Sequence, residues 1–371
     1  MDVPGPLSWL APGGGLSGLL RRGLKHTGVV QALTTRTAIV DLLDLADVTV
    51  PYAERSAPLG LDRFPLALDG ADHEEARQVV AAALLRSDGE QRAGVDDAEQ
   101  VVRTNLDEAR GRGAVDVVSK VIDPALVAWV ERWFGLPGCG PDLLRCGRLI
   151  THATFLNPPL PAFRVDLGGL RRAVDEVQAQ HEALLAPMAE APPGTVSHAL
   201  LQVVDPELAA SHLLGLTVGP LALGSKALAE GVDLRLDGPW TAASIPTAEH
   251  GEAAFATLVD RCPPLPGVLR HNPVERRVQG GRRRVTVPAG LVLAATACPA
   301  HRGDVGAPAL AYGHGRHRCL GEAQITGLGG RVLWLLGQHA PSRVGRLRAA
   351  PRPLGVRRWS FPGRLVVSLD A

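Results

Sequence analysis

Aromatic residues are scarce in this sequence, and neither sign of charge is in excess. Phe, Trp and Tyr make up 4% of the 371 residues, and the formal net charge is +1 at pH 7. With so few aromatic side chains, the core must be built from Leu, Val and Ala, which suits closely packed helices. A net charge near zero provides no overall field that would attract nucleic acid or a membrane surface. We therefore expect neither of them as a partner.

Paired cysteines and long apolar runs are also absent. The five cysteines form no Cys-x-x-Cys pair, which in a chain of this length favours a reduced, cytoplasmic protein over a disulfide framework. The amino terminus, MDVPGPLSW, begins acidic and lacks the basic-then-apolar order of a signal peptide. The longest suggestive apolar stretch without a charge, 213–225, is too short to cross a bilayer. These features predict a soluble, cytoplasmic protein.

The first half of the chain has the patterns of helices. We expect helices over 72–85, 124–134 and 170–185. In the first of them, Asp72 is the predicted N-cap, and Glu75 three residues later completes a capping-box pattern.

A longer helix is predicted from Asp205 to Glu230. Asp205 at the N-cap, Pro206 at the first helical position and Glu207 in the first turn are start signals, and Gly231 is a stop signal. About 26 residues that rise ~1.5 Å each span about 39 Å, enough to cross a whole domain. Because its middle is apolar nearly all round, we expect this helix to be central.

Strand patterns appear only late in the sequence. Residues 284–287 and 291–293 flank Pro-Ala-Gly and indicate a small hairpin, and the ending WSFPGRLVVSLDA indicates another. One more helix is expected after Cys319. No repeat of fixed period is present, and the segments rich in Pro and Gly are short. We therefore predict a mostly α fold with small antiparallel β-sheets, in a single domain over residues 1–371.

The strongest chemical signal is the segment YGHGRHRCLG, residues 312–321. Its glycines allow positive φ and close approach of the backbone to something flat. It presents Cys319 just before a helix, where the dipole and the free amides favour a thiolate. Such a cysteine can be a nucleophile or a metal ligand. Three plainer interpretations are an inert buried cysteine, a zinc site with His314 and His317 that lacks a fourth ligand, and a Cys–His nucleophile pair.

The same segment resembles the haem-binding loop of cytochromes P450, F-G-x-G-x-H/R-x-C-x-G. The resemblance implies a P450-like fold, haem b as the cofactor, and Cys319 as the thiolate ligand of the iron. It also implies that His317 is a partner of a haem propionate and that Tyr312 packs beside the sulfur. The matching residues are Gly313, Gly315, His317, Cys319 and Gly321, with Tyr312 in place of Phe.

The resemblance covers most of the chain and suggests further haem contacts. His73 and Arg77 lie at i and i+4 of the predicted 72–85 helix and match the family's His-x-x-x-Arg pair, which meets the propionates. Arg276 or Arg277 lies about where the family has another propionate arginine, and we assign Arg277. The alternatives are a solvated helix face for the first pair and an exposed basic hairpin for the second.

Two motifs of the family are degenerate on the side of the cysteine. The family's K helix carries Glu-x-x-Arg, and Arg270 with the following His-Asn-Pro resembles the end of that helix, so Gly267 replaces the Glu. The family's long meander, whose arginine completes a network with this pair, is mostly missing, because only 298–310 precedes Tyr312. The two losses agree, since a Glu without its network would be a costly buried charge.

The central helix departs from the family on the opposite side of the haem. The family's A-G-x-D/E-T motif hands protons to bound oxygen, and the matching register here gives Leu221 and Ala222, which carry none. Glycines on one helix face let a flat ring approach, and the proline is expected to kink the helix. A plainer interpretation is a pair of short core helices broken by glycine and proline. The predicted distal residues are Gly215, Thr217, Gly219, Pro220 and Ala222.

These features predict a haem-thiolate enzyme with unusual chemistry. We expect it to act on a small apolar metabolite in bacterial secondary metabolism, by an atypical oxidation or a rearrangement rather than standard hydroxylation. Ferredoxin or peroxide is a possible co-reactant. One alternative is a P450-like helper that stabilises a partner enzyme such as a glycosyltransferase. Another is a classical monooxygenase with an unusual proton relay through Thr217 or water.

Overall fold

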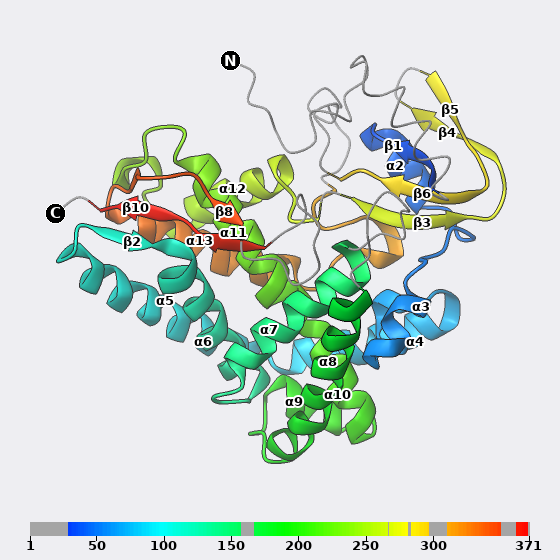
Figure 1. The fold of residues 1–371 in the computed structure, drawn as a ribbon, viewed down its shortest axis with the longest axis horizontal. Coiled ribbons are helices and arrows are strands. Elements are labelled where there is room, and N and C mark those ends of the chain that lie inside the picture. The colour runs from blue at the N-terminus through cyan, green and yellow to red at the C-terminus, as the bar shows by residue number, and fades with distance from the viewer. Residues whose placement is uncertain are drawn as a thin grey trace.

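The structure is a computed structural model that describes residues 29–156, 167–265, 267–280, 283–296, 310–349 and 361–369. Helices dominate these residues and enclose the core (Figure 1). The helices are α2 (Arg36–Leu43), α3 (Ala53–Ser56), α4 (Gly70–Arg86), α5 (Asp88–Arg110), α6 (Asp123–Phe134), α7 (Gly140–Thr151), α8 (Leu167–Ala189), α9 (Val196–Leu201), α10 (Pro206–Thr217), α11 (Gly224–Arg235), α12 (Ala248–Arg261) and α13 (Glu322–Gln338).

The strands form four small sheets. Their orders are β1-β6-β3, β2-β10-β7, β4-β5 and β8-β9, and every pairing except the parallel β1-β6 is antiparallel. The prediction of a mostly α fold with small sheets is therefore confirmed, with one mixed sheet. The strands are β1 (Val29–Leu33), β2 (Ala114–Asp116), β3 (Val268–Asn272), β4 (Arg276–Gly280), β5 (Arg283–Val287), β6 (Gly290–Ala294), β7 (Ser342–Arg343), β8 (Arg348–Ala349), β9 (Pro362–Arg364) and β10 (Val366–Ser368).

Both predicted hairpins are wrong in their pairing. Strand β5 pairs with β4, whereas β6 pairs with β1 and β3, because the Asn272 amide of β3 donates to the carbonyls of Val287 and Pro288 and directs the chain into the other sheet. At the C-terminal end, β9 pairs with β8 and β10 pairs with β2 and β7. There the carboxylate of Asp116 accepts from the Leu365 amide and fixes the chain beside β2.

The long central helix is present and is continuous from Pro206 to Arg235. Its middle, Val218–Leu223, is π-helical, so the chain passes from α10 to α11 without a break at Pro220. Because proline has no amide hydrogen, a local shift to the wider i→i−5 pattern accommodates it. The plainer interpretation of two separate short helices is therefore wrong, and the helix ends five residues beyond the predicted Glu230.

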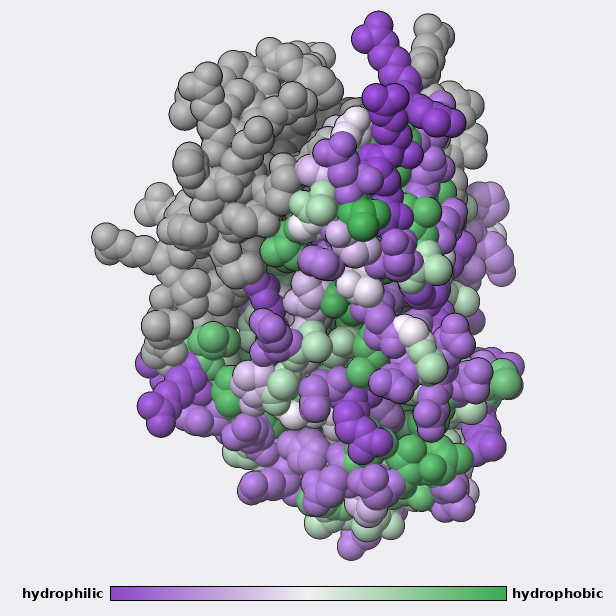
Figure 2. All heavy atoms as spheres, turned by 90° about the vertical axis from the view of Figure 1, so that its right-hand side faces the viewer, coloured by the Kyte–Doolittle hydropathy of each residue, from purple (hydrophilic) through white to green (hydrophobic). Residues whose placement is uncertain are grey.

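This helix is also the one segment among the described residues that is long and apolar enough to cross a membrane. Of the most apolar 18-residue window of this helix, 72% is buried inside the protein. Such burial is typical of a core helix in a globular protein, and the described residues on the face drawn in Figure 2 are mostly hydrophilic.

Two glycines of α13 and one glycine of α12 let these two helices pack closely against each other. A Cβ on Gly330 would lie 2.4 Å from the backbone nitrogen of Glu252, and one on Gly329 would lie 2.6 Å from the Phe255 ring. From the other side, a Cβ on Gly251 would lie 2.2 Å from the Gly330 carbonyl oxygen. The glycines cost helix propensity, roughly 1 kcal/mol each, but they let the two helices touch through their backbones.

The segment with Arg270 is a strand, not the end of a K helix. Residues Val268–Asn272 form β3, a strand of the β1-β6-β3 sheet. The helix that precedes it is α12, whose last turn carries Asp260 in a bidentate pair with Arg36 of α2. Its sequence, AEHGEAAFATLVDR, also contains no Glu-x-x-Arg. The expected loss of the meander falls mostly on 297–309, outside the described residues.

Candidate functional site

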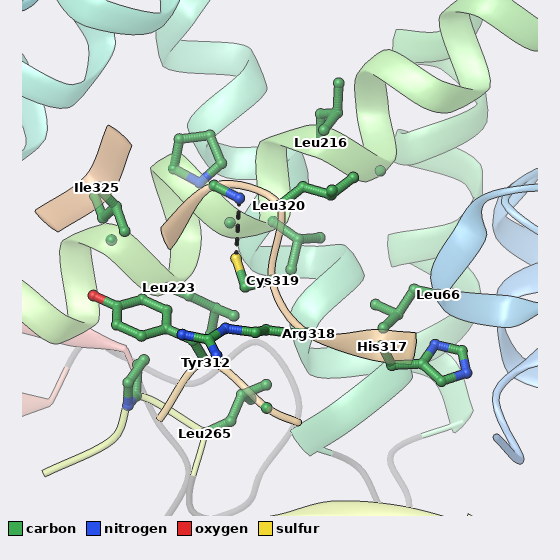
Figure 3. Close-up of a pocket in the computed structure, with 18 of the residues that line it drawn as sticks. Leu66, Leu216, Leu223, Leu265, Tyr312, His317, Arg318, Cys319, Leu320 and Ile325 are labelled. Atoms are coloured by element: carbon green, nitrogen blue, oxygen red, sulfur yellow. Dashed lines mark hydrogen bonds between the residues drawn. The ribbon is translucent and has the colours of Figure 1, made fainter. Parts of the chain in front are cut away.

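The described residues enclose a cavity of about 280 Å³. One wall is formed by α10, the π-helical segment and α11, and the opposite wall by the chain from Leu310 to Ile325. Helix α4 and strand β3 contribute polar groups to one side of it. Figure 3 shows the cysteine loop, which we define as residues 312–321, crossing this cavity below the helix.

Cys319 presents its thiol to the cavity from the end of this loop. Its amide donates to the Tyr312 carbonyl at 2.8 Å, and its sulfur accepts from the Gly321 amide at 3.3 Å (Figure 3). Gly313 and Gly315 have φ of 75° and 64°, so the turn needs residues without a Cβ. Burial raises the pKa of the thiol above its ordinary value, while the Gly321 amide acts in the opposite direction.

Tyr312 lies beside the sulfur, as the resemblance implied. Its hydroxyl is 3.0 Å from the Thr326 hydroxyl on α13, a contact that Phe could not make. Burial raises the pKa of Tyr312 to about 12. The ring is therefore neutral and held by α13 against the loop that carries Cys319.

The zinc interpretation has no support in the described part of the chain. His314 faces Asp44 at 2.9 Å, and His317 faces Asp69 at 3.2 Å, so both imidazoles are engaged with carboxylates away from the sulfur. No group of three His, Cys, Asp or Glu side chains there could hold a metal ion. Cys319 instead faces open cavity, which suits a ligand to a metal brought in by a cofactor.

Basic side chains line one side of the cavity. His73 and Arg77 of α4 lie one turn apart, and the His73 ring packs against that of His317 of the cysteine loop, with the ring centroids 4.1 Å apart and the planes tilted by 44°. Both ring nitrogens of His73 are buried without a hydrogen-bond partner. Burial, together with the charges of His317 and Arg77, lowers the pKa of His73 to about 4. This imidazole is neutral and has no hydrogen-bond partner among the residues that the structure describes.

Arg270, not Arg277, is the arginine that joins Arg77 at this site. Its side chain is 6% exposed and lines the cavity from β3, where it donates to the Leu269 carbonyl at 2.8 Å. Burial lowers its pKa, while the nearby Tyr52 acts in the opposite direction. Arg277 lies on the exposed side of β4, outside the cavity, which corrects the assignment made from the sequence. The error arose because the sequence analysis matched Arg270 to the end of the family's K helix. Arg270 lies in strand β3 instead, so the residues after it were matched to the wrong positions of the family.

The structure brings part of the predicted distal set together. Gly215, Gly219 and Pro220 line the cavity, and a Cβ on Gly219 would meet nothing within 4 Å. Thr217 and Ala222 face away from it. The Thr217 hydroxyl donates to the Leu214 carbonyl at 2.6 Å, and a relay through it would have to cross the helix.

The helix register differs by one residue from the one expected. Leu223, rather than Ala222, follows Gly219 and Pro220 on the cavity wall, because the π-helical turn rotates the residues after Pro220. Leu216 and Leu223 line the cavity around Cys319, and Leu66 lines it beside His317 (Figure 3). In either register the helix offers hydrocarbon where the family has an acid and an alcohol.

Phe64 is a cavity residue that the sequence did not reveal. Its ring lies flat on α10, where a Cβ on Gly215 would come within 2.4 Å of it. The segment around it has a Pro-Leu-Ala turn, η3 (Pro65–Ala67), but no motif. The only available signal was a glycine in a long helix, which indicates close approach of a neighbour without naming it.

The residues present fit haem b. A thiol opens onto the cavity at one side, an unpartnered imidazole and two arginines lie where carboxylates of a flat ring would need donors, and glycines thin the opposite wall. Burial of the Arg270 guanidinium is costly, and an anion that enters the site would offset this cost. The site is built for a group that is flat, apolar at its centre and anionic at its edge.

The sequence matches no protein-family profile and no curated protein. Solved structures match over nearly the whole chain. CYP164A2 from Mycobacterium smegmatis is 19% identical with a TM-score of 0.75, over 98% of this chain and 97% of that one. The structure of P450BioI in complex with an acyl carrier protein ligated to hexadec-9Z-enoic acid is 16% identical with a TM-score of 0.73, over 91% of both chains. The chain has the cytochrome P450 fold.

The bacillaene polyketide synthase cytochrome P450 PksS from Bacillus subtilis is similar too, with 16% identity and a TM-score of 0.69 over 92% of this chain and 90% of that one. The P450 fold accounts for the arrangement of the two cavity walls. The cysteine loop and the long helix occupy opposite walls, as the resemblance implied from 312–321 and 205–230. What distinguishes this P450 fold is the lack of Glu-x-x-Arg on α12 and of a proton-carrying side chain on the helical wall.

Proposed function

We propose that the protein is a haem-thiolate enzyme in which Cys319 binds the iron of haem b. The observation that carries this proposal is a thiol open to a cavity whose rim also holds Arg77, the buried Arg270 and the buried imidazole of His73, whose ring nitrogens have no hydrogen-bond partner among the described residues. Bound haem would supply redox and Lewis-acid chemistry at the centre of the cavity. Arg77, Arg270 and His73 would hold its carboxylates, together with His317, whose own bond to Asp69 keeps the imidazole oriented.

The opposite wall supports an atypical reaction. The residues of α10, the π-helical segment and α11 that face the cavity are Gly, Leu, Val, Pro and Ala, and none of these side chains donates or accepts a proton. Protons must therefore arrive with the substrate or the co-reactant, or through water. Peroxide-driven oxidation, one-electron coupling and rearrangement without net oxygen insertion meet this requirement better than standard hydroxylation.

The substrate class follows from the same wall. Phe64, Leu66, Leu216 and Leu223 present hydrocarbon to the cavity, so an apolar small molecule is favoured. We propose a role in bacterial secondary metabolism, in the cytoplasm, with ferredoxin or peroxide as co-reactant. PksS, named for a polyketide synthase, is consistent with this class of pathway.

The proposal is tested by the spectrum of the purified protein after reduction and addition of carbon monoxide. We expect the red-shifted band of a thiolate-ligated haem, and its loss in Cys319→Ala. Cys139→Ala, which removes a half-buried thiol at the start of α7, is the matched control and should keep the band. A Cys319→Ala variant with an unchanged spectrum would refute the ligand assignment, and colourless protein that copurifies with a transferase would favour the helper function.

A second measurement addresses the reaction class. Product formation with peroxide, but not with ferredoxin and NADPH, is expected if the helical wall delivers no protons. Equal turnover with ferredoxin and NADPH would instead favour the classical monooxygenase, with water as the relay.

A further inference from the structure

Arg316, three residues before Cys319, reaches a distant part of the chain. One guanidinium nitrogen, Nη2, lies 2.7, 2.8 and 3.0 Å from the carbonyl oxygens of Leu45, Ala46 and Val48. These three carbonyls converge from the loop that follows α2, which we call the anchor loop and define as residues 44–50. A guanidinium is suited to such a cluster, because its charge strengthens each bond and its planar donors are fixed in direction.

The two residues before Arg316 also lie against the end of α2 and the anchor loop. His314 Nε2 is 2.9 Å from Asp44 Oδ1. A Cβ on Gly315 would lie 3.1 Å from the Leu43 carbonyl oxygen, and its φ of 64° requires glycine there. Three successive residues, 314–316, are therefore held against the end of α2 and the anchor loop.

The anchor loop is itself fixed to three other elements. Asp47 makes a bidentate pair with Arg276 of β4, and Thr49 exchanges two backbone hydrogen bonds with His271 of β3. The amide of Val50 donates to Asp69 at 2.7 Å, and the other oxygen of that carboxylate faces His317. The anchor loop thus provides a base for residues 314–316 of the cysteine loop and is connected to His317 through Asp69.

The family's usual support is replaced on this side of the molecule. In the family that this chain resembles, Glu-x-x-Arg and the meander arginine form a network beside the cysteine loop. Here α12 contains no Glu-x-x-Arg, and Asp260 in its last turn pairs with Arg36 instead. A loop that must hold one sulfur in place needs another partner, and Arg316 provides contacts of that kind.

We propose that Arg316 is a positioning residue that holds Cys319 towards the cavity by clamping the cysteine loop to the anchor loop. The link between them is short, because the Arg318 amide donates to the Gly315 carbonyl at 3.0 Å and the Cys319 amide donates to Tyr312. A shift of Arg316 is therefore passed to the sulfur through one helical turn, Gly315–His317. The proposal rests on the proposed role of Cys319 as the iron ligand.

The first test follows local opening of the loop by hydrogen exchange in the full-length protein without added haem. In Arg316→Leu we expect peptides covering 312–321 to exchange about tenfold faster or more, while α12 peptides are unchanged. Arg316→Lys keeps a cationic donor and should restore part of the protection. Arg318→Leu is the matched control, because Arg318 is exposed and pairs with Glu322, and its loop should exchange as in the wild type.

The second test follows the sulfur through the spectrum of the haem-loaded protein. We expect Arg316→Leu to lose at least half of the thiolate-type band with carbon monoxide, Arg316→Lys to recover part of it, and Arg318→Leu to keep it. Wild-type exchange and a wild-type band in Arg316→Leu would overturn the clamp. If the wild type itself shows no such band, the iron-ligand proposal fails, and the exchange experiment still decides whether Arg316 holds the loop.

Discussion

At the scale of residues, the described ionisable groups of the cavity lie on the cysteine loop, α4, β3 and Tyr52, and the helical wall carries none. That wall presents Gly219 and Leu223 instead. A single side chain at the helical wall can therefore change the reaction without disturbing the groups that would hold haem.

Leu223→Thr tests whether the missing alcohol limits the reaction. A positioned proton donor contributes typically about 10²–10⁴-fold to a rate-limiting proton transfer. We expect Leu223→Thr to raise product formation with ferredoxin and NADPH at least about tenfold, with little effect on peroxide-driven turnover. Val218→Thr adds the same hydroxyl elsewhere on the wall and should not raise it. A matching rise in both variants, or in neither, would argue against this explanation.

The sequence located the cysteine wall of the site better than the helical wall. His73, Arg77 and Cys319 could be placed because an i, i+4 spacing and a glycine-rich turn constrain geometry locally. Arg270 could not, since a strand and a helix end look alike in a short apolar run. The cavity-facing register of the long helix depends on a π-helical turn at Pro220, which periodicity of 3.6 residues cannot predict.

At the scale of elements, local sequence patterns predicted the helices correctly and the pairing of the strands poorly. The helices 124–134 and 170–185 lie within α6 and α8, and 72–85 lies within α4, although that helix begins at Gly70 and Asp72 is not its N-cap. The strands pair with partners far along the chain, which no turn signal between neighbours reveals.

Gly330→Ala is expected to destabilise the protein by disturbing the close contact between α12 and α13. The added methyl would meet the Glu252 backbone, which cannot move aside as a flexible side chain could. Overpacking of this kind typically costs about 1–3 kcal/mol in the free energy of unfolding, measured by urea denaturation.

Gly327→Ala is the control for that substitution on the same helix. Its Cβ would find only a Glu252 side-chain oxygen at 3.8 Å, so helix propensity should decide, with a gain of up to about 1 kcal/mol. Two equal losses would mean that the glycines of α13 act through something other than the close contact with α12.

At the scale of the whole molecule, the interior is intolerant of protonated histidine. His152 and His212 are 4% and 1% exposed, and burial, followed by nearby cationic side chains, lowers the pKa of each to about 4. The expectation of a single domain over residues 1–371 stays a prediction. If it holds, these histidines titrate with the global unfolding of the chain.

The protein should therefore lose stability as the pH falls from about 6.5 towards 4. The unfolded chain binds protons on these histidines below its ordinary pKa of 6.5, whereas the native state stays neutral until about 4. Each can contribute up to about 3 kcal/mol to this loss. His212→Leu should make the pH dependence of the urea midpoint shallower, because it removes one of these buried imidazoles. An unchanged slope in His212→Leu would contradict the assignment.

The reach of Arg316 also has a consequence for biosynthesis. Its partners Leu45, Ala46 and Val48 lie 271, 270 and 268 residues earlier in the chain. At about 5–20 residues per second, a ribosome needs roughly 10–60 s to add that length. The anchor loop is therefore made long before the cysteine loop that it holds. With the proposed roles of Arg316 and Cys319, the haem site is complete only after these two loops are in contact. Loading with haem should accordingly be among the last events in the maturation of this protein.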